Sequence, residues 1–239
     1  MPTPMKLSDV MAALEAKGSE STKRIFLKHG AKEPFFGVKV ADLKVIAKQL
    51  KGEQALALEL YATGNGDAQY LAGLIIDGTR MTRAQVQSWA DRAAWRMISA
   101  SIVPPVASEH ADGFALARAW IDSPKEHVAI AGWHSLGALA TVLPDAQLPL
   151  KELGALLDRV VKTLPAAPDR IRQAMNYYVI ACGTYVAPLG GKAIATARKL
   201  GKVEVDVGDT DCKIPEAESY IMKSRRGAVI APKRQTVRC

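Results

Sequence analysis

The sequence predicts an all-α fold, an α-solenoid built from paired helices. Apolar residues recur with helical periodicity along nearly the whole chain, and the connections between the helical segments are short. Strand-like alternation occurs only in "KVEVDV" at 202–207, which is too short to build a sheet. About eleven helices are too many for a simple bundle, whereas helix pairs stacked side by side form an α-solenoid of HEAT-like repeats.

The helices can be placed in chain order from their apolar stripes and from the residues that separate them. Leu7, Val10, Met11 and Leu14 predict a first helix, with Ser8 or Asp9 near its cap. Further helices are expected at 20–29, 38–50, 53–62, 67–77, 82–93, 95–106, 112–122, 126–142, 149–163, 169–185 and 188–200. Loops rich in glycine and proline separate them, such as "KEPFFG", "TGNGD", "LPDAQLP" and "APLGG".

Two helical segments, "GDAQYLAGLIIDG" and "KEHVAIAGWHSLGAL", loosely repeat each other. Both are rich in Ala and Gly, and such small residues let neighbouring helices approach closely. We therefore expect a single solenoid domain over residues 1–200. A basic, partly irregular C-terminal extension is expected over residues 201–239.

The composition favours a folded protein that binds anions. The chain has 239 residues, of which 49% are hydrophobic and 23% charged, so it can bury a large core. Its formal net charge of +8 favours nucleic acid as a partner, with a membrane surface second. No apolar run reaches roughly 18 residues, so no membrane span is expected. The N-terminal residues also lack the apolar core of a signal peptide.

The cysteines and other potential ligands indicate neither a metal nor a cofactor. Cys182, Cys212 and Cys239 form no C-x-x-C motif, so neither a disulfide framework nor a zinc site is expected, as in a cytoplasmic protein. The loop "DVGDTDCKIP" lacks the ligand order of a calcium loop. The four histidines have no metal-ligand spacing, and no phosphate-binding glycine motif occurs.

The C-terminal segment 223–239 carries much of the excess positive charge. It contains six cationic residues and no acidic one: Lys223, Arg225, Arg226, Lys233, Arg234 and Arg238. One interpretation is an arm that lies along phosphates. The alternative is a solvated, frayed terminus.

The stretch "DRIRQAMNYYVIACGTYV" at 169–186 is a second candidate site. On a helical wheel, Tyr178 belongs to the core face, whereas Arg170 and Tyr177 share a different face. Arg172 and Asn176 fall on a third face, also away from the core. An aromatic ring beside guanidinium and amide groups suits a nucleic-acid or anion site. The alternative is an ordinary solvated face.

Three segments in this order resemble a known family. "KEPFFGVKVADLKVIAKQL", "AWRMISASIVPPV" and "DRIRQAMNYYVIACGTY" are similar to segments of the AlkD-like DNA alkylation repair family, whose members are built from HEAT-like repeats. The resemblance covers about residues 25–200. It implies a right-handed superhelix whose concave basic face grips duplex DNA. It also implies a DNA glycosylase that releases N3- and N7-alkylated purines, a reaction in which a carboxylate stabilises the developing oxocarbenium sugar.

The chain departs from the family pattern at the residues that carry this chemistry. Aligned on Ser101–Val103, the family's catalytic aspartate falls on Ala100, and its paired tryptophans fall on Trp95 and Arg96. Its DNA-gripping arginine falls near Ala131, and its later tryptophan falls on Tyr177. The early tyrosine of the family falls on or near Phe26, and the nearby carboxylates Asp91, Glu109 and Asp122 could substitute for the aspartate only in a different helix register.

The sequence therefore favours a DNA-binding member of this family, with base excision left open. Arg170, Arg172, Asn176 and Tyr177 are the first candidates for the DNA-binding site, and no catalytic residue is assigned. Trp95, Arg96 and Lys39 are secondary candidates, although a tryptophan between helices is more often buried. We expect a monomer that binds double-stranded DNA, with RNA as an alternative. The rival function is a helical-repeat scaffold for protein interactions without nucleic-acid chemistry.

Overall fold

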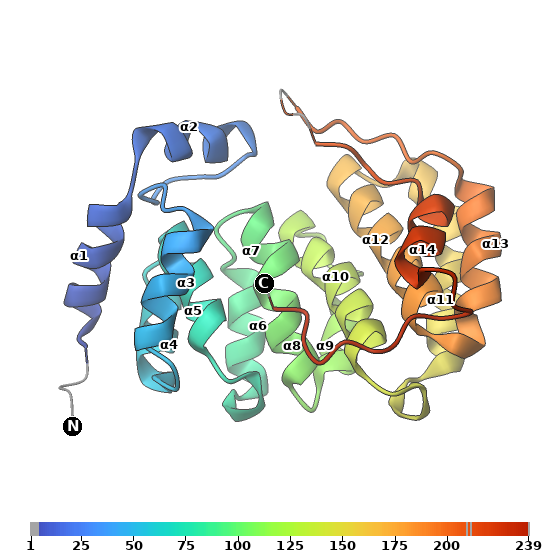
Figure 1. The fold of residues 1–239 in the computed structure, drawn as a ribbon, viewed down its shortest axis with the longest axis horizontal. Coiled ribbons are helices and arrows are strands. Elements are labelled where there is room, and N and C mark those ends of the chain that lie inside the picture. Colours follow the sequence, from blue (N-terminus) through green and yellow to red (C-terminus); the bar gives the residue numbers. More distant parts are fainter. Residues whose placement is uncertain (1–4, 209, 211, 239) are drawn as a thin grey trace.

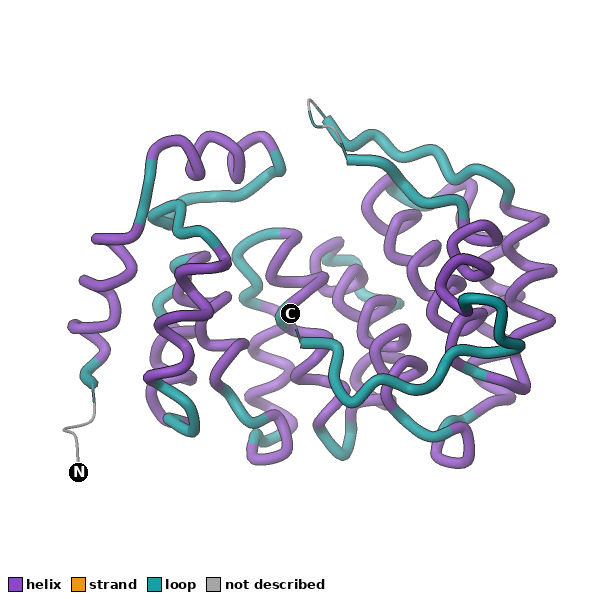
Figure 2. The backbone as a smooth tube through the Cα atoms, in the orientation of Figure 1, coloured by secondary structure: helices purple, strands orange, loops and turns teal. Residues whose placement is uncertain are grey.

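The computed structural model describes residues 5–208, 210 and 212–238, and these form α-helices without a strand. The helices lie side by side in chain order along the long axis, from α1 at one end to α13 at the other (Figure 1). Their bounds are Leu7–Lys17 (α1), Glu20–Lys28 (α2), Val40–Gln49 (α3), Gln54–Ala62 (α4), Gly66–Ile75 (α5), Arg83–Asp91 (α6), Arg96–Ser101 (α7), Val103–Glu109 (α8), Gly113–Trp120 (α9), Glu126–Val142 (α10), Leu150–Thr163 (α11), Asp169–Tyr185 (α12), Gly190–Leu200 (α13) and Ala217–Arg225 (α14). The predicted all-α fold is confirmed, and Figure 2 shows helices and loops only over the described part of the chain.

Helix α10 joins the two halves of the hydrophobic core. Its residues Val128 and Ala131 belong to the cluster formed mainly by α1–α8, whereas Trp133 and Leu136 belong to the cluster formed by α9–α14. Helix α10 packs against α7, α8, α9 and α12, and α12 in turn packs against α13 and α14. Of the helices that the structure describes, none is long and apolar enough to cross a bilayer.

Glycines allow the close helix packing that the Ala/Gly-rich segments predict. A Cβ atom on Gly73 would lie 2.2 Å from Ile102 Cγ2, and one on Gly132 would lie 2.7 Å from the backbone nitrogen of Ile121. Real Cβ atoms do not approach other heavy atoms so closely, so only glycine fits where α5 meets Ile102 and α10 meets the end of α9. The prediction made from "GDAQYLAGLIIDG" and "KEHVAIAGWHSLGAL" is thus confirmed at these two positions.

One predicted helix was wrong, and one helix was not predicted. The segment 95–106 is not one helix, because α7 ends before Ile102 and α8 begins at Val103. Pro104 and Pro105 lack the N–H groups that would continue α7, and their rings would clash with carbonyls four residues earlier. As expected from its length, the strand-like segment 202–207 builds no sheet, whereas helix α14 was not predicted.

A buried carboxylate fixes the loop that carries α2. Asp67 at the start of α5 is 3% exposed and accepts hydrogen bonds from the backbone N–H groups of Phe36 (2.6 Å), Gly37 (2.9 Å) and Val38 (3.2 Å). Burial raises the pKa of this carboxyl, while the three hydrogen bonds act in the opposite direction. Phe26 of α2 packs against Trp95 with ring centroids 5.4 Å apart. These contacts hold α2 over the N-terminal end of α7.

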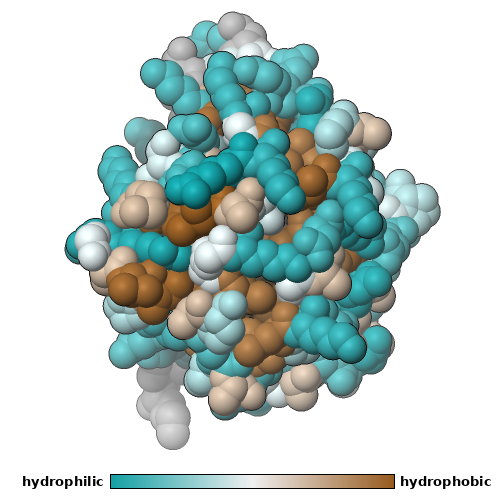
Figure 3. Space-filling model, turned by 90° about the vertical axis from the view of Figure 1, so that its right-hand side faces the viewer, coloured by the Kyte–Doolittle hydropathy of each residue, from teal (hydrophilic) through white to brown (hydrophobic). Residues whose placement is uncertain are grey.

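The described part of the extension returns along the solenoid. Beyond α13 the chain runs out past α12 and comes back to α14, which packs against α12 and α13. We call residues 226–238 the tail; it crosses α12 and α10 and ends beside α7 (Figure 1). Figure 3 views the α13 end of the molecule and shows hydrophobic patches separated by hydrophilic residues.

Candidate nucleic-acid interface

A basic cleft of about 530 Å³ opens at the N-terminal ends of α7, α10 and α12. We define the basic cleft by its five cationic lining residues, Lys28, Lys32, Arg92, Arg96 and Arg170. They come from α2 and the loop after it, from the α6–α7 connection and α7, and from the first turn of α12. Since the chain contributes them from widely separated positions, the cleft exists only in the folded solenoid.

Among the described lining residues of the cleft, the cations outnumber the carboxylates by five to two. Among the described lining residues, the carboxylates are Asp91 and Glu126. Asp91 already receives the Lys125 ammonium group at 2.9 Å, and this hydrogen bond is the main cause of the lowered pKa of its carboxyl. The N-termini of α10 and α12 add the positive end of each helix dipole to the same opening. The cleft is therefore an environment that favours an anion.

Arg96 and Arg170 have no carboxylate partner among the described residues. Arg96 is half-buried, its Nε has no hydrogen-bond partner, and it forms no ion pair with any residue that the structure describes. Burial lowers the pKa of Arg96, and the neighbouring charge of Arg170 lowers it further. Arg170 donates one hydrogen bond, at 3.3 Å, to the neutral side chain of Gln173. A phosphate group placed between these guanidinium groups would relieve their repulsion.

Of the secondary DNA-binding candidates, Trp95 is buried and Lys39 is exposed. Trp95 borders the basic cleft but is only 7% exposed, and it packs against Phe26. This placement matches the buried-tryptophan alternative. Lys39 is exposed immediately before α3 and lies outside the described lining of the cleft.

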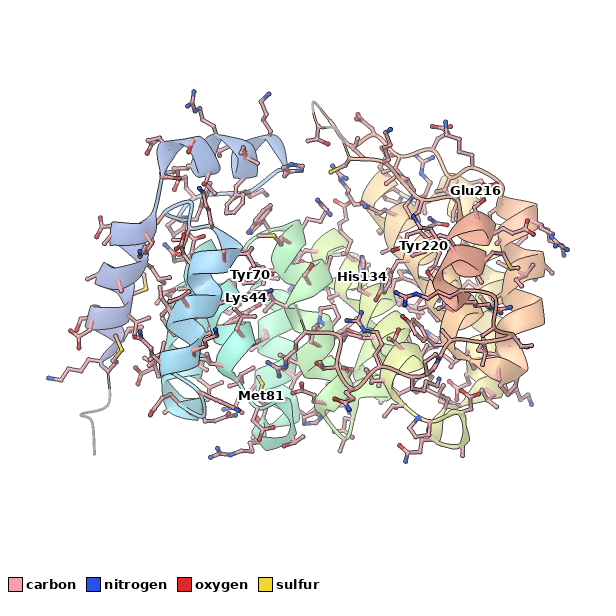
Figure 4. The ribbon with its side chains drawn as sticks, viewed as in Figure 1. Lys44, Tyr70, Met81, His134, Glu216 and Tyr220 are labelled. Atoms are coloured by element: carbon pink, nitrogen blue, oxygen red, sulfur yellow. The ribbon has the colours of Figure 1, made fainter. Side chains whose placement is uncertain are left out.

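A second, smaller pocket of about 220 Å³ brings Ala100 and Tyr177 together. We call it the central pocket; its described lining residues are Ala100, Ser101, Pro104, Pro105, His134, Ala138, Tyr177 and Val237. Figure 4 shows His134 on α10, in the middle of the molecule. The centroids of the His134 and Tyr177 rings are 4.7 Å apart. Burial, together with the charge of Arg96, lowers the pKa of His134 to about 3, so its imidazole is neutral at physiological pH.

The central pocket has no carboxylate among its described lining residues. Each of the three carboxylates considered as substitutes has a cationic partner elsewhere. Asp91 pairs with Lys125, Glu109 with Arg238, and Asp122 with Arg159 and Arg118. None of the described carboxylates is therefore placed in this pocket to stabilise an oxocarbenium ion.

The helical-wheel analysis of α12 was partly right. Arg170 and Tyr177 do line cavities on one side of the helix, but Arg170 borders the basic cleft and Tyr177 the central pocket. Burial raises the pKa of the Tyr177 hydroxyl, and its ring fits against Gly137, where a Cβ would lie 2.6 Å from the ring atom Cε1.

The prediction that Asn176 faces away from the core was wrong. Asn176 is 1% exposed, and its amide donates a hydrogen bond of 2.8 Å to the carbonyl of Pro215 in the extension. Arg172 is half-buried and pairs with Asp169 on its own helix. A wheel drawn for α12 alone could not show that the extension covers this face.

The basic C-terminal segment is neither a frayed terminus nor a wholly free arm in its described residues. Arg225, Lys233 and Arg238 hydrogen-bond to α12, α10 and α5, respectively. Lys223, Arg226 and Arg234 are exposed. Three of these six cations are thus occupied within the molecule, and the other three face solvent.

Sequence reasoning missed several residues of these cavities. Lys28, Lys32 and Arg92 line the basic cleft, and His134 lines the central pocket. Arg92 stands only four residues before the predicted Arg96, so the cluster "DRAAWR" carried a usable signal. Lys28 and Lys32 carried none, because only the fold brings α2 above α7. No group of His, Cys, Asp and Glu residues suited to a metal occurs among the residues searched, which are the described ones.

The chain is similar to known proteins over most of its length. A family model described as "DNA alkylation repair enzyme" matches residues 10–207. Uncharacterized protein Lin0241 of Listeria innocua is 34% identical over 218 residues, covering 89% of this chain and 94% of that protein. Uncharacterized protein Lmo0209 of Listeria monocytogenes is 33% identical over 218 residues, with 89% and 94% covered.

A solved structure matches the whole architecture. It is described as "A new family of proteins related to the HEAT-like repeat DNA glycosylases with affinity for branched DNA structures". Its TM-score to this chain is 0.87 at 36% sequence identity, covering 98% of this chain and 100% of the other. The predicted HEAT-like α-solenoid is therefore confirmed.

Proposed function

Because the chain belongs to the DNA alkylation repair enzyme family, we propose that it binds DNA, with branched DNA preferred, and that it does not excise alkylated bases. The basic cleft is the proposed contact surface. A single observation carries the proposal: Arg96 and Arg170 lie side by side in the cleft without a carboxylate partner among the described residues. Two uncompensated guanidinium groups are suited to a phosphate of the DNA backbone.

The preference for branched DNA is supported by the relative of known structure, whose description gives it that affinity. The cleft fits such a role because its cations come from three directions, namely α2, the α6–α7 connection and α12. Backbone contacts from several directions select DNA by shape rather than by base sequence.

The absence of base excision is supported by the central pocket. Ala100 stands where the family's aspartate aligns, and its methyl group can neither stabilise an oxocarbenium ion nor position water. The pocket offers instead a neutral imidazole and a tyrosine with a raised pKa. Neither group supplies the negative charge that this reaction needs.

Binding is tested with a fluorescent four-way junction and a linear duplex of the same length, titrated at several salt concentrations. Arg96→Ala and Arg170→Ala should each weaken junction binding and reduce the slope of log K against log salt by about 1. Arg118→Ala is the matched control, because Arg118 on α9 pairs with Asp122 and is not among the described lining residues of the cleft. Equal behaviour of all three variants would contradict the cleft as the binding surface.

The same experiment separates DNA binding from the protein scaffold that the sequence left open. A scaffold predicts neither junction binding nor a steep salt dependence. Base excision is tested by incubating the protein with duplexes that carry N3- or N7-methylated purines. We expect release at the spontaneous rate, and faster release that is lost in Tyr177→Phe would show that excision survives without the aspartate.

A further inference from the structure

The tail is anchored at the C-terminal ends of successive helices. Lys233 Nζ donates a hydrogen bond of 2.8 Å to the carbonyl of Ala140 in α10, and the backbone N–H of Arg234 donates one of 3.0 Å to Thr141. The backbone N–H of Ala231 reaches the carbonyl of Thr184 in α12 at 2.9 Å. Each anchor places a donor, and in one case a cation, at the negative end of a helix dipole.

Prolines leave two of these carbonyls open. In an α-helix, the carbonyl of residue i accepts from the N–H of residue i+4. Residue 144 is proline and cannot donate to Ala140, and residue 188 is proline and cannot donate to Thr184. The tail therefore fills hydrogen-bonding positions that the solenoid itself leaves unsatisfied.

The end of the tail is clamped by an ion pair and covers the central pocket. Arg238 donates from Nε (2.7 Å) and Nη2 (2.5 Å) to the two carboxylate oxygens of Glu109 on α8, and from Nη1 to the carbonyl of Gly73 on α5. This bidentate clamp holds the adjacent Val237 against the opening lined by Ala100, His134 and Tyr177.

The attachment of the tail is mainly polar. Of its apolar side chains, Ala231 is buried, Val237 and Ile230 are half-buried, and Val229 is 88% exposed. The principal contacts are instead charge-assisted hydrogen bonds from Lys233 and Arg238, with Lys233 also pairing with Asp145 at 2.8 Å. Both ion pairs are partly buried, so salt screens them less than exposed pairs, but a polyanion can replace the carboxylates as the partner of these cations.

We propose that Glu109 and Asp145 compete with DNA for the cations of the tail, so that the tail lies over the central pocket until a polyanion binds these cations and displaces it. In the closed state, Lys233 and Arg238 are occupied by helix ends and carboxylates. In the open state, these cations bind phosphates and the central pocket is uncovered. The inference rests on the proposed DNA binding, which supplies the polyanion.

The clamp is tested with Glu109→Gln. This change removes the charge that holds Arg238, while the amide oxygen still accepts the hydrogen bond from the Gly78 N–H (3.0 Å in the wild type). Glu152→Gln is the matched control, because it changes the net charge equally at an exposed position of α11. We expect Glu109→Gln to bind the four-way junction about fivefold more tightly than Glu152→Gln, since less of the protein is in the closed state.

Tail opening is measured separately by thiol labelling of Val237→Cys in a Cys212→Ser/Cys239→Ser background. Labelling should accelerate with salt, with Glu109→Gln and with saturating junction DNA. The proposal is wrong if junction DNA binds without changing the labelling rate and if Glu109→Gln binds the junction no more tightly than Glu152→Gln. The tail is then a fixed structural element. If salt and Glu109→Gln open the tail but no DNA binds, the proposed function fails. The competition between DNA and the carboxylates then fails with it, because the protein has no DNA partner.

Discussion

Acidification should destabilise the protein through His134, and His134→Gln should remove most of that dependence. The folded state holds the imidazole neutral, with a pKa of about 3 against an ordinary value of 6.5, because the protein around the half-buried ring disfavours its charged form and Arg96 is near. When folding lowers the pKa of a histidine, the free energy of unfolding is unaffected by that histidine at pH values above its unfolded pKa. The free energy of unfolding then decreases as the pH falls from 6.5 towards 3.

The size of the effect follows from these two values. At pH 5 the unfolded chain has protonated His134 almost completely, whereas the folded chain has not. The difference between the two states corresponds to about 1.5 pKa units, or about 2 kcal/mol lost from the free energy of unfolding. By pH 4 the calculated loss rises to about 3 kcal/mol.

Urea denaturation of the wild type and of His134→Gln at pH 7.5 and pH 5.0 measures this loss. The other three histidines are present in both proteins, so their titration cancels in the comparison. The wild type should lose about 2 kcal/mol more than the variant between the two pH values. Equal losses would refute the reasoning, because they would show that the native site accepts a proton on His134 without cost.

Three further predictions follow from packing and hydrogen bonding. Asp67→Ala leaves three backbone N–H groups of the α2–α3 loop without their acceptor and should cost about 3 kcal/mol or more in thermal unfolding. Gly137→Ala forces the Tyr177 ring away and should cost about 1–3 kcal/mol in chemical denaturation. Lys233→Ala removes one anchor of the tail and should speed tryptic cleavage after Arg234, whereas Lys151→Ala on α11 should not.

The long helices could be predicted from the sequence because their signals are local. Helices α10 and α12 have the bounds that periodicity and flanking prolines predict, 126–142 and 169–185. Helix α14 was missed because its nine residues bury only Ala217 and Ile221, which is too short a pattern to detect. The break at Ile102 depends on two adjacent prolines that could equally have stood in the first turn of a longer helix.

Candidate site residues could be proposed from the sequence only where the signal lies within a short segment of the chain. Arg170 and Arg96, which the sequence singles out as DNA-binding candidates, both line the basic cleft, and each lies near the start of its helix. The burial of Asn176 and the docking of Arg238 depend on the extension folding back onto the solenoid. Such contacts join residues far apart in the chain, and no local pattern records them.

The tail also changes how the solenoid is expected to fold and to resist force. In a simple repeat array each repeat contacts only its neighbours, so the ends unravel independently of the middle. Here Arg238 contacts Gly73, 165 residues earlier, and Glu109, 129 residues earlier. The tail can dock only after α5, α8, α10 and α12 have formed, so closing this long loop is expected to be a late folding step. A force applied to the C-terminus would act first on the contacts of the tail with α5 and α8 in the centre of the molecule. The array is therefore expected to unfold after these contacts break, rather than repeat by repeat from its end.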